Sequence, residues 1–417
     1  MATPLEMAGS PVYSSRDDFA RQSLRREDNA RMRMETVFVV LSCLFGAGEL
    51  VGAPAGQAGL KVLRSGAVND QVVDALSPGG LVRTRSGDLI TTFVNKGDAA
   101  AGSKCFLVRS SDEGKTWSQP YMTVEPTSKN EGVFTELVQL PNGDLLMLVI
   151  RIWHRDASRK GVFGYRESTI ELKTSRDNGD SFQSIGFLDT APKSLTSTSG
   201  AIYRLKNGDL IIPAYCYTKQ SSMEPGYREG SGFFRSSNGG ARWGRMEVAF
   251  QDPPSNESAK QNFNEAAFAV RDDGVVVAYA RIDIHKGAEY RKNKLWTSRS
   301  EDQGATWTTP VKTEIAGIYP VITRLPSGAF VMACGLRDSE VGRRTTSFFT
   351  SDDGVEWSYR GHPYYSRTKG LPANSATGGS QAMITMGGDM LYIVFYAHDP
   401  KLPGLHKTYV DGCLLKL

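Results

Sequence analysis

The stretch Ser110–Trp117 reads SSDEGKTW and has the form S-x-D-x-G-x-T-W. In such a phrase an Asp or Asn side chain bonds its own backbone a few residues on and folds a tight turn. The Gly supplies a position with positive φ, and the closing aromatic ring can pin the turn onto a sheet. This phrase, here called the box, returns at Ser175–Phe182, Ser236–Trp243, Ser300–Trp307 and Thr350–Trp357. Five copies in one chain predict a repeat architecture.

A second motif precedes every box and consists of two apolar strands joined by a turn that carries Gly. Asn-Gly, Asp-Gly, Ser-Gly and Gly-Gly are hairpin turn signals when they stand between β-rich runs. Six such hairpins occur, at Leu81–Phe93, Leu137–Val149, Ala201–Tyr215, Ala267–Ala280, Pro320–Ala333 and Gln381–Tyr396. The first five are each followed by a further strand and then a box.

A hairpin, a third strand, a box and an outer strand together make a four-stranded antiparallel propeller blade. The boxes start 50 to 65 residues apart, which exceeds the roughly 40–45 residues of a compact blade. The additional residues fall mainly between hairpin and third strand, as in Trp153–Arg166 and Lys219–Gly230. We expect these insertions to lie on one face and to build a binding surface.

The sixth hairpin has no box and is followed by Leu405–Leu417, which supplies the third strand of the last blade, or its third and fourth. Leu60–Asn69 is a candidate strand to complete that blade from the other end of the chain. Closing the ring in this way removes open sheet edges. We therefore expect an all-β, six-bladed β-propeller of four-stranded antiparallel blades over residues 60–417.

The N-terminal region has a different character. Residues 1–31 are mostly polar and charged and are expected to be a disordered or untranslated tail. Residues 32–59 follow Arg31 and contain Met32-Arg33-Met34, the apolar run Val37–Ala47 and a zone of small residues, which indicates a signal peptide. The protein is then secreted or periplasmic. A buried element of the domain and a signal anchor are the alternatives.

Composition narrows the function classes. A net charge of +4 over 417 residues argues against a nucleic-acid-binding protein. Beyond the signal region there is no C-x-x-C, the five His are scattered, and neither a metal nor another cofactor is expected. The remaining cysteines are expected to be core thiols, although an exported protein could also pair them: Cys105, Cys216, Cys334 and Cys413.

The five boxes, the six hairpins and the export signal together resemble the sialidase (neuraminidase) superfamily of six-bladed propellers, over nearly the whole mature chain. Family sialidases bind the carboxylate of a terminal sialic acid with an arginine triad and use a Tyr–Glu nucleophile pair and an Asp general acid. The family places its catalytic Glu nine residues before the fourth hairpin Gly and a triad Arg seven after it. With Gly274 as that Gly, the resemblance assigns Glu265 and Arg281.

The resemblance also implies positions for the other groups. A late triad Arg lies shortly before the fifth box, where Arg343 and Arg344 stand; alternation along a strand lets only one point inward, and we assign Arg344, with Arg337 as a competitor. Asp98 is the only acid between the first hairpin and the first box, which makes it either the general acid or a turn residue. Two hairpins supply further candidates for the mouth, namely Tyr319 and the pair Glu136 and Arg151, for which a structural ion pair is the preferred interpretation.

Two family features are missing. The first triad Arg is expected about ten residues before the first hairpin Gly, where Ser77 stands. The nucleophilic Tyr is expected near residues 376–381, which read ATGGSQ.

These patterns lead to one preferred function and two alternatives. We expect a secreted, monomeric exo-glycosidase that hydrolyses terminal sialic acid or a related acidic sugar from a glycan substrate. The alternatives are a propeller that binds glycan without cleaving it, and a polysaccharide lyase that needs a base near a neutralising Arg.

Overall fold

The computed structural model describes residues 59–97, 100–154, 165–190, 195–217, 230–251, 261–284, 294–338, 343–361 and 377–417. These residues belong to the compact unit Ala55–Leu417. The expected signal peptide and both long insertions therefore fall wholly or largely outside the described residues. Within the described ranges, no helix is long and apolar enough to cross a membrane.

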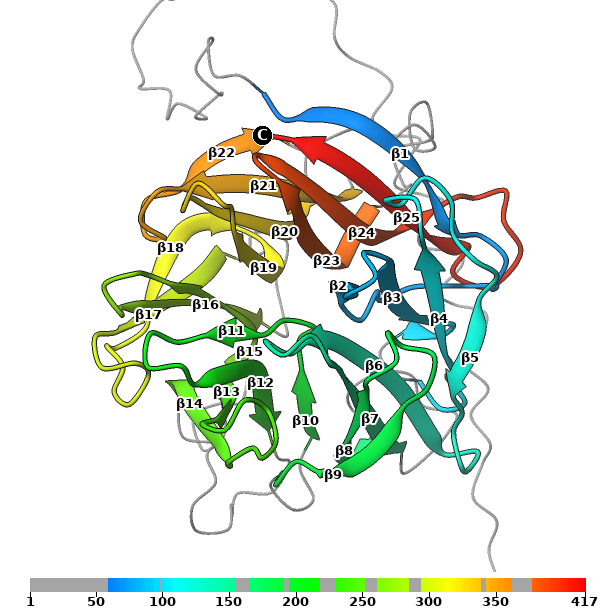
Figure 1. Cartoon of the computed structure of the whole chain (residues 1–417), viewed down its shortest axis with the longest axis horizontal. Helices are drawn as coiled ribbons and strands as arrows, with labels where there is room; N and C mark the ends of the chain where they lie inside the picture. Colours follow the sequence, from blue (N-terminus) through cyan, green and yellow to red (C-terminus); the bar gives the residue numbers. More distant parts are fainter. Residues whose placement is uncertain are drawn as a thin grey trace, which may run out of the picture. The chain divides into compact units, whose positions relative to one another are not determined.

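The described strands form six antiparallel sheets, arranged as the blades of a propeller around a common centre (Figure 1). Blade 1 contains β2 (Leu81–Arg83), β3 (Leu89–Val94), β4 (Cys105–Ser110) and β5 (Tyr121–Val124). Blade 2 contains β6 (Glu131–Gln139), β7 (Leu145–His154), β8 (Tyr165–Ser175) and β9 (Gln183–Phe187). Blade 3 contains β10 (Leu195–Thr198), β11 (Tyr203–Arg204), β12 (Leu210–Tyr217), β13 (Gly230–Ser236) and β14 (Met246–Gln251).

The second half of the ring repeats this order. Blade 4 contains β15 (Gln261–Val270), β16 (Val276–Ile284), β17 (Lys294–Ser300) and β18 (Val311–Ala316). Blade 5 contains β19 (Ile318–Arg324), β20 (Phe330–Asp338), β21 (Arg343–Ser351) and β22 (Ser358–Gly361). Blade 6 contains β23 (Thr377–Gly387), β24 (Met390–His398), β25 (Thr408–Lys416) and, from the other end of the chain, β1 (Lys61–Asn69). The six-bladed all-β fold is thus confirmed.

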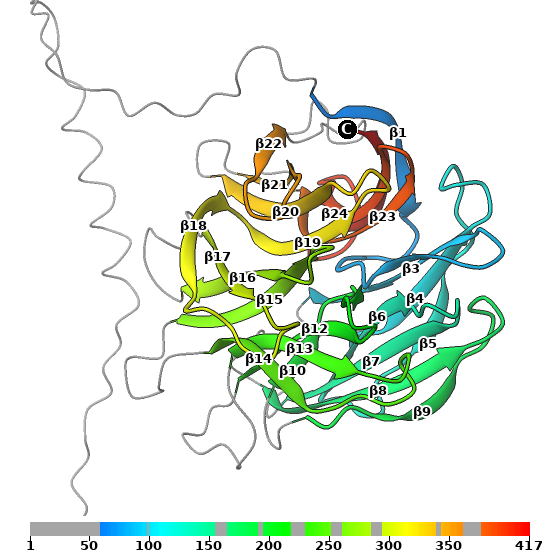
Figure 2. The ribbon, with the colours of Figure 1, turned by 60° about the vertical axis from the view of Figure 1, so that its left-hand side comes forward.

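Ring closure follows the predicted route. Strand β1 pairs with β25 in antiparallel register, from Lys61 opposite Lys416 to Asn69 opposite Val410, and runs along its outer side (Figure 1 and Figure 2). β25 is therefore the third strand of blade 6 and β1 is the fourth. This settles the alternative that the sequence left open for residues 405–417.

The hydrophobic core lies between the blades rather than within one centre. Six buried clusters occur in the described residues, and each joins two neighbouring blades. One example packs Leu148 and Ile150 of blade 2 against Ile212 and Phe234 of blade 3. Because both faces of each sheet are covered in this way, the strands read as apolar runs and not as simple alternation.

The box turns fold as expected from their residue types. In the first box the Ser110 Oγ accepts the N–H of Gly114 at 2.8 Å, and Asp112 Oδ1 accepts the N–H of Thr116 at 2.9 Å. Hydrogen bonds from the side chain and backbone of Thr116 hold the pKa of Asp112 well below its usual value. The fifth box uses Ser351 and Asp353, one residue later than the phrase predicts.

Each box turn also contacts the blade before it. The carbonyl of Gly114 in blade 1 accepts a 3.0 Å hydrogen bond from Tyr392 in blade 6, and that of Gly354 in blade 5 accepts one of 2.9 Å from Tyr279 in blade 4. The repeated phrase therefore joins neighbouring blades as well as turning the chain. The four described cysteines are buried thiols, so the prediction of core thiols is confirmed.

Candidate active site

The inner strands of three successive blades carry β-bulges near the centre of the ring. The registers shift between Asn264 and Ala267 in β15, between Ile318 and Val321 in β19, and between Thr377 and Gln381 in β23. Bulges re-aim side chains and are frequent beside active sites. The inner strand of blade 3 is interrupted as well, between β10 and β11.

Two bulge residues have a backbone conformation that L-residues rarely adopt. Glu265 has φ 47° and Tyr319 has φ 49°. Such a conformation costs about 1–3 kcal/mol for each residue and persists only where the surroundings impose it. Strain at two interacting residues points to this part of the ring as the candidate site.

Glu265 is held on both sides. The Arg281 guanidinium contacts both carboxylate oxygens through Nη1, at 2.8 Å from Oε1 and 3.0 Å from Oε2. The backbone N–H of Tyr319 in the next blade donates to Oε2 at 3.1 Å. The side chains of Glu265 and Arg281 keep 15% and 14% of their surface exposed, so the pair remains within reach of a ligand.

Tyr319 connects three blades. Its hydroxyl lies 3.5 Å from Oε1 of Glu136 in blade 2, and its carbonyl accepts a 2.5 Å hydrogen bond from Nε2 of Gln381 in blade 6. Burial, together with the charges of Glu136 and Glu265, raises the pKa of Tyr319 well above its usual value. The hydroxyl therefore stays protonated at neutral pH.

Glu136 is a buried carboxyl group, with 3% of its surface exposed. Among the described residues its Oε2 has no hydrogen-bond partner, and Oε1 has only the long contact to Tyr319. A β-carbon at position 200 would collide with Oε2, because Gly200 covers the carboxyl group closely. Burial raises the pKa of Glu136 well above its usual value, which favours the protonated form of the carboxyl group.

We use the name central layer for Glu265, Arg281, Tyr319, Glu136 and Gln381. It joins groups from four blades, and it contains one glutamate beside an arginine and one buried glutamate whose pKa is raised. Two titratable groups of the same kind in such different surroundings are suited to different roles in acid–base chemistry.

The structure separates Glu136 from Arg151, which the sequence had paired. Arg151 Nη1 contacts Oε1 of Glu131 at 2.7 Å, and Glu131 also accepts hydrogen bonds from Thr127. Glu131 and Glu136 are five residues apart on one strand and so point to opposite faces. The pair Glu136–Arg151 was therefore a wrong prediction, and Arg151 belongs to a separate ion pair.

The other predicted residues are only partly described. The register of blade 5 places Arg344 of β21 directly opposite Arg337 of β20, but both side chains lie outside the described part of the structure. Asp98 also lies outside the described residues.

The structure shows which residues stand where the two family features are missing. Ser77 is followed by Gly79 and Gly80, and a β-carbon at either glycine would collide with backbone carbonyls of β6. Gln381, from the stretch where the sequence offers no Tyr, holds the backbone of Tyr319 instead. Gln381 and Gly200 escaped the sequence analysis; a polar residue that opens an apolar hairpin strand was the available signal for Gln381.

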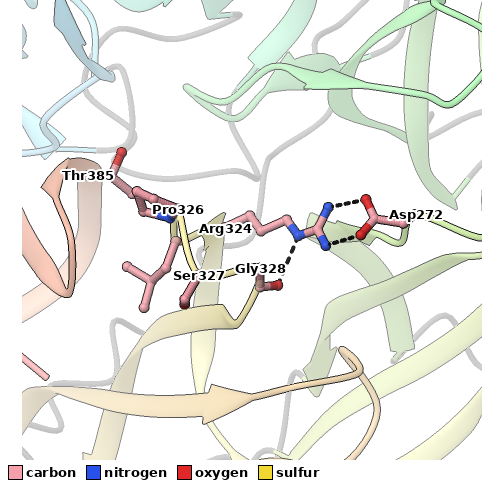
Figure 3. Close-up of a pocket in the computed structure, with 7 residues that line it drawn as sticks. Asp272, Arg324, Pro326, Ser327, Gly328 and Thr385 are labelled. Atoms are coloured by element: carbon pink, nitrogen blue, oxygen red, sulfur yellow. Dashed lines mark hydrogen bonds and ion pairs between the residues drawn. The ribbon is translucent and has the colours of Figure 1, made fainter.

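Two cavities lie next to each other, near the ends of β15 and β19 that are farther from the central layer. One, of about 340 Å³, is lined by residues that include Tyr203, Phe268 and Arg324. The second, of about 550 Å³, shares Arg324, whose guanidinium faces Asp272 and whose Nε donates to the Gly328 carbonyl at 2.8 Å (Figure 3). Tyr319 precedes Arg324 by five residues, or roughly 16 Å of strand, so these cavities are separate from the central layer.

Comparisons with known proteins agree with this fold. A crystal structure of a protein of unknown function from Dyadobacter fermentans superimposes with a TM-score of 0.65 at 19% identity, covering 86% of this chain and 100% of that one. The intramolecular trans-sialidase of Ruminococcus gnavus, solved with oseltamivir carboxylate, gives 0.57 at 13% identity, with 84% and 96% covered. The α-L-arabinanase of Penicillium chrysogenum, solved with arabinobiose, gives 0.53 at 16% identity, with 86% and 98% covered.

These similarities show a propeller scaffold that glycoside hydrolases also use. A search of the curated proteins gave no match. The profile of the BNR repeat-like domain matches residues 134–362, which is more than half of the chain and includes four of the five boxes. The chain therefore belongs to the BNR repeat-like domain family, and its fold is a six-bladed β-propeller.

Proposed function

We propose that this protein is a glycoside hydrolase that removes a terminal acidic sugar, sialic acid or a related one, from glycans. The observation that carries the proposal is the Glu265–Arg281 pair on a strained bulge in the central layer. A purely structural ion pair gains nothing from a backbone conformation that costs free energy. An enzyme gains a carboxylate aimed at its substrate.

The pair suits glycosidic bond cleavage. Most glycosidases place a carboxylate beside the anomeric carbon, where it acts as a nucleophile or activates water. The guanidinium of Arg281 favours the ionised form of Glu265, which either role requires. Arg281 also keeps the carboxylate oriented, because one nitrogen of the guanidinium contacts both of its oxygens.

Two arginines support an acidic substrate. Arg337 and Arg344 stand opposite each other near the ends of β20 and β21, in the blade that supplies Tyr319. Arginine binds carboxylates through paired, charge-assisted hydrogen bonds. The similarity to a trans-sialidase adds support for a sialic acid, and the similarity to an arabinanase makes other sugars necessary in the test.

The experiment is a substrate panel with a catalytic variant and a matched control. Purified protein is incubated with 3′-sialyllactose, uronate-terminated oligosaccharides and arabinan oligosaccharides, and released sugar is quantified. We expect release of an acidic monosaccharide by wild type and by Glu247→Gln, whose glutamate pairs with Arg235 between the two outer strands of blade 3. Glu265→Gln should lose about 10²–10⁴-fold in rate.

Other outcomes would redirect the assignment. Saturable glycan binding without released sugar would favour a non-catalytic binding protein. A product that absorbs ultraviolet light through a new double bond would favour a lyase. Turnover that Glu265→Gln leaves intact would remove the central layer from the chemistry.

Export is part of the proposal. The charged segment, apolar run and small residues within positions 32–59 support secretion or transfer to the periplasm. Expression of the full sequence should give a mature protein whose first residue lies near position 60, as read by N-terminal sequencing. An intact N-terminus in the cell fraction would contradict export.

A further inference from the structure

Glu136 and Tyr319 have no role in the hydrolysis described so far, yet both belong to the central layer, where Tyr319 contacts Glu265. We propose that Glu136 is the proton reserve of this site and that it delivers its proton to the leaving group through the hydroxyl of Tyr319. This inference rests on the proposed hydrolase function and names a proton donor for it. It makes Tyr319 the catalytic acid and Glu136 a residue that acts through it.

The geometry of Tyr319 carries the inference. Its backbone N–H binds Oε2 of Glu265 at 3.1 Å, while its hydroxyl lies 3.5 Å from Oε1 of Glu136. One residue thus bridges the two carboxyl groups, with its backbone at the exposed one and its side chain at the buried one. The positive φ of Tyr319 fixes this arrangement, and Gln381 holds the carbonyl of the same residue.

The surroundings of Glu136 suit a group that stores a proton. Its Oε2 is buried with no partner among the described residues, and Gly200 leaves no space for a side chain there. The titratable groups that face it are Tyr319 from β19 and Cys105 from β4.

None of these neighbours is a cation that would favour the ionised form of Glu136. Further out, Tyr215 and Glu265 face Tyr319, and Arg151 of β7 faces Cys105 and is bonded to Glu131. An unpaired carboxyl group in such a site keeps its proton.

The proposed step conserves atoms and charge. With Glu265 as the nucleophile, its carboxylate oxygen forms a bond to the anomeric carbon as the glycosidic C–O bond breaks, and the Tyr319 O–H proton goes to the departing oxygen. The Glu136 O–H proton then passes to Tyr319, which returns to the phenol, and Glu136 becomes the carboxylate. Water next attacks the anomeric carbon, the bond to Glu265 breaks and restores its carboxylate, and the proton of the water travels back through Tyr319 to Glu136.

Leaving-group dependence tests the proton transfer. A departing alkoxide needs a proton, whereas 4-nitrophenolate leaves without one. We expect Glu136→Gln and Tyr319→Phe to lose about 10²–10⁴-fold in kcat/KM on the methyl glycoside of the released sugar, and far less on its 4-nitrophenyl glycoside. Tyr279→Phe, which removes another buried hydroxyl in the next blade, is the control and should not discriminate between the two substrates.

The opposite results are equally clear. Equal losses on both substrates would overturn the inference, because a structural role has no reason to depend on the leaving group. If Asp98→Asn shows the leaving-group dependence and Glu136→Gln does not, the acid is Asp98. Either result, obtained with active wild type, leaves the proposed hydrolase function standing.

Infrared spectroscopy tests the stored proton without any substrate. A protonated carboxyl group has a C=O stretch that a carboxylate lacks. At pH 7 we expect this band in wild type and in Glu265→Gln, and its loss in Glu136→Gln. Absence of the band in folded wild type would overturn the inference, and a wild type that hydrolyses nothing would remove the proposed function and the transfer step together.

Discussion

The hairpins β6–β7 and β15–β16 each carry a cross-strand glutamate–arginine pair, and the two pairs differ in their backbone. Glu131 and Arg151 lie on strands whose register is regular between them, and the Glu131 side chain is fully buried. Glu265 and Arg281 flank a bulge, and Glu265 has a positive φ. The contact distances, 2.7 Å and 2.8 Å, hardly distinguish them.

The difference distinguishes a pair that stabilises the fold from the pair that we propose for the chemistry. The Glu131 carboxylate is shared with Thr127 and Arg151, so its hydrogen bonds stay within one hairpin and its lead-in. The Glu265 carboxylate reaches the next blade through Tyr319. Backbone strain and contacts with a neighbouring blade therefore distinguish a candidate site from a structural ion pair, which side-chain distances alone do not.

The largest expected effect is a loss of stability when Glu131–Arg151, the pair without backbone strain, is broken. Glu131→Gln leaves Arg151 without its carboxylate in a largely buried position, which costs about 3–5 kcal/mol when an ion pair of this kind is broken. Thermal unfolding followed by circular dichroism should show a clearly lower Tm than in wild type. Glu265→Gln, at the more exposed pair, should lower Tm much less. An equal loss of Tm in the two variants would mean that both pairs are structural ion pairs.

The next largest effect is a loss of activity when Glu265–Arg281, the pair with a strained backbone, is altered. Arg281→Lys keeps the charge but cannot hold the carboxylate with a planar guanidinium. We expect kcat/KM on the substrate identified by the panel to fall by about 10²-fold, with Arg151→Lys close to wild type. If Arg151→Lys loses as much as Arg281→Lys, the distinction between the hairpins is wrong.

A smaller effect is expected at the cover of Glu136. Gly200→Ala places a β-carbon against the Glu136 carboxyl group and the backbone of Gly80, and we expect a loss of about 1–3 kcal/mol. Gly244→Ala is the matched control between the two outer strands of the same blade, because a β-carbon there would meet its nearest atom at an ordinary 3.7 Å, and it should cost about 1 kcal/mol or less. Denaturant unfolding compares the two variants; a more damaging change at Gly244 would show that the carboxyl group is not tightly enclosed.

The smallest effect is the pH dependence of stability, which should have opposite signs for two glutamates on β6. The folded pKa of Glu136 is raised above 4.5, so its contribution is present below that pH and is lost as pH rises towards the folded value. Glu136→Gln should therefore gain in Tm relative to wild type above about pH 4.5.

Glu131 supplies the contrast on the same strand. Hydrogen bonds from Thr127 and Arg151 outweigh the effect of burial and lower its pKa. Its contribution is present above about pH 4.5 and is lost as pH falls through the folded value. The Tm deficit of Glu131→Gln should accordingly shrink in acid, and parallel pH profiles for the two variants would contradict the assignment.

Most of the fold could be predicted from the sequence because its signals are local. The Gly114 and Asp112 of a box act within one turn, and hairpin dipeptides such as Asn207-Gly208 act between adjacent strands. The closure by β1 followed from counting strands in the last blade.

The candidate site was predictable only in part because its contacts join different blades. Glu265 and Arg281 share one hairpin and were found through their spacing. Tyr319 was named as a candidate, but its contacts with Glu136 and Gln381 cross the ring. A positive φ at a tyrosine has no sequence signature. The Glu136–Arg151 pair was predicted wrongly because spacing alone did not show that Glu131, and not Glu136, lies on the face of β6 that Arg151 contacts.

The pairing of β1 with β25 has a consequence for how the protein is made. The strand of the propeller that leaves the ribosome first has as its partner the strand that leaves it last. Blade 6 therefore stays incomplete, with an exposed edge, until synthesis of the ring has finished, and such edges favour aggregation. Its closure depends on contacts across nearly the whole chain, which are the slowest kind to form. The same strand pair that completes the ring thus sets the order in which its blades can become complete.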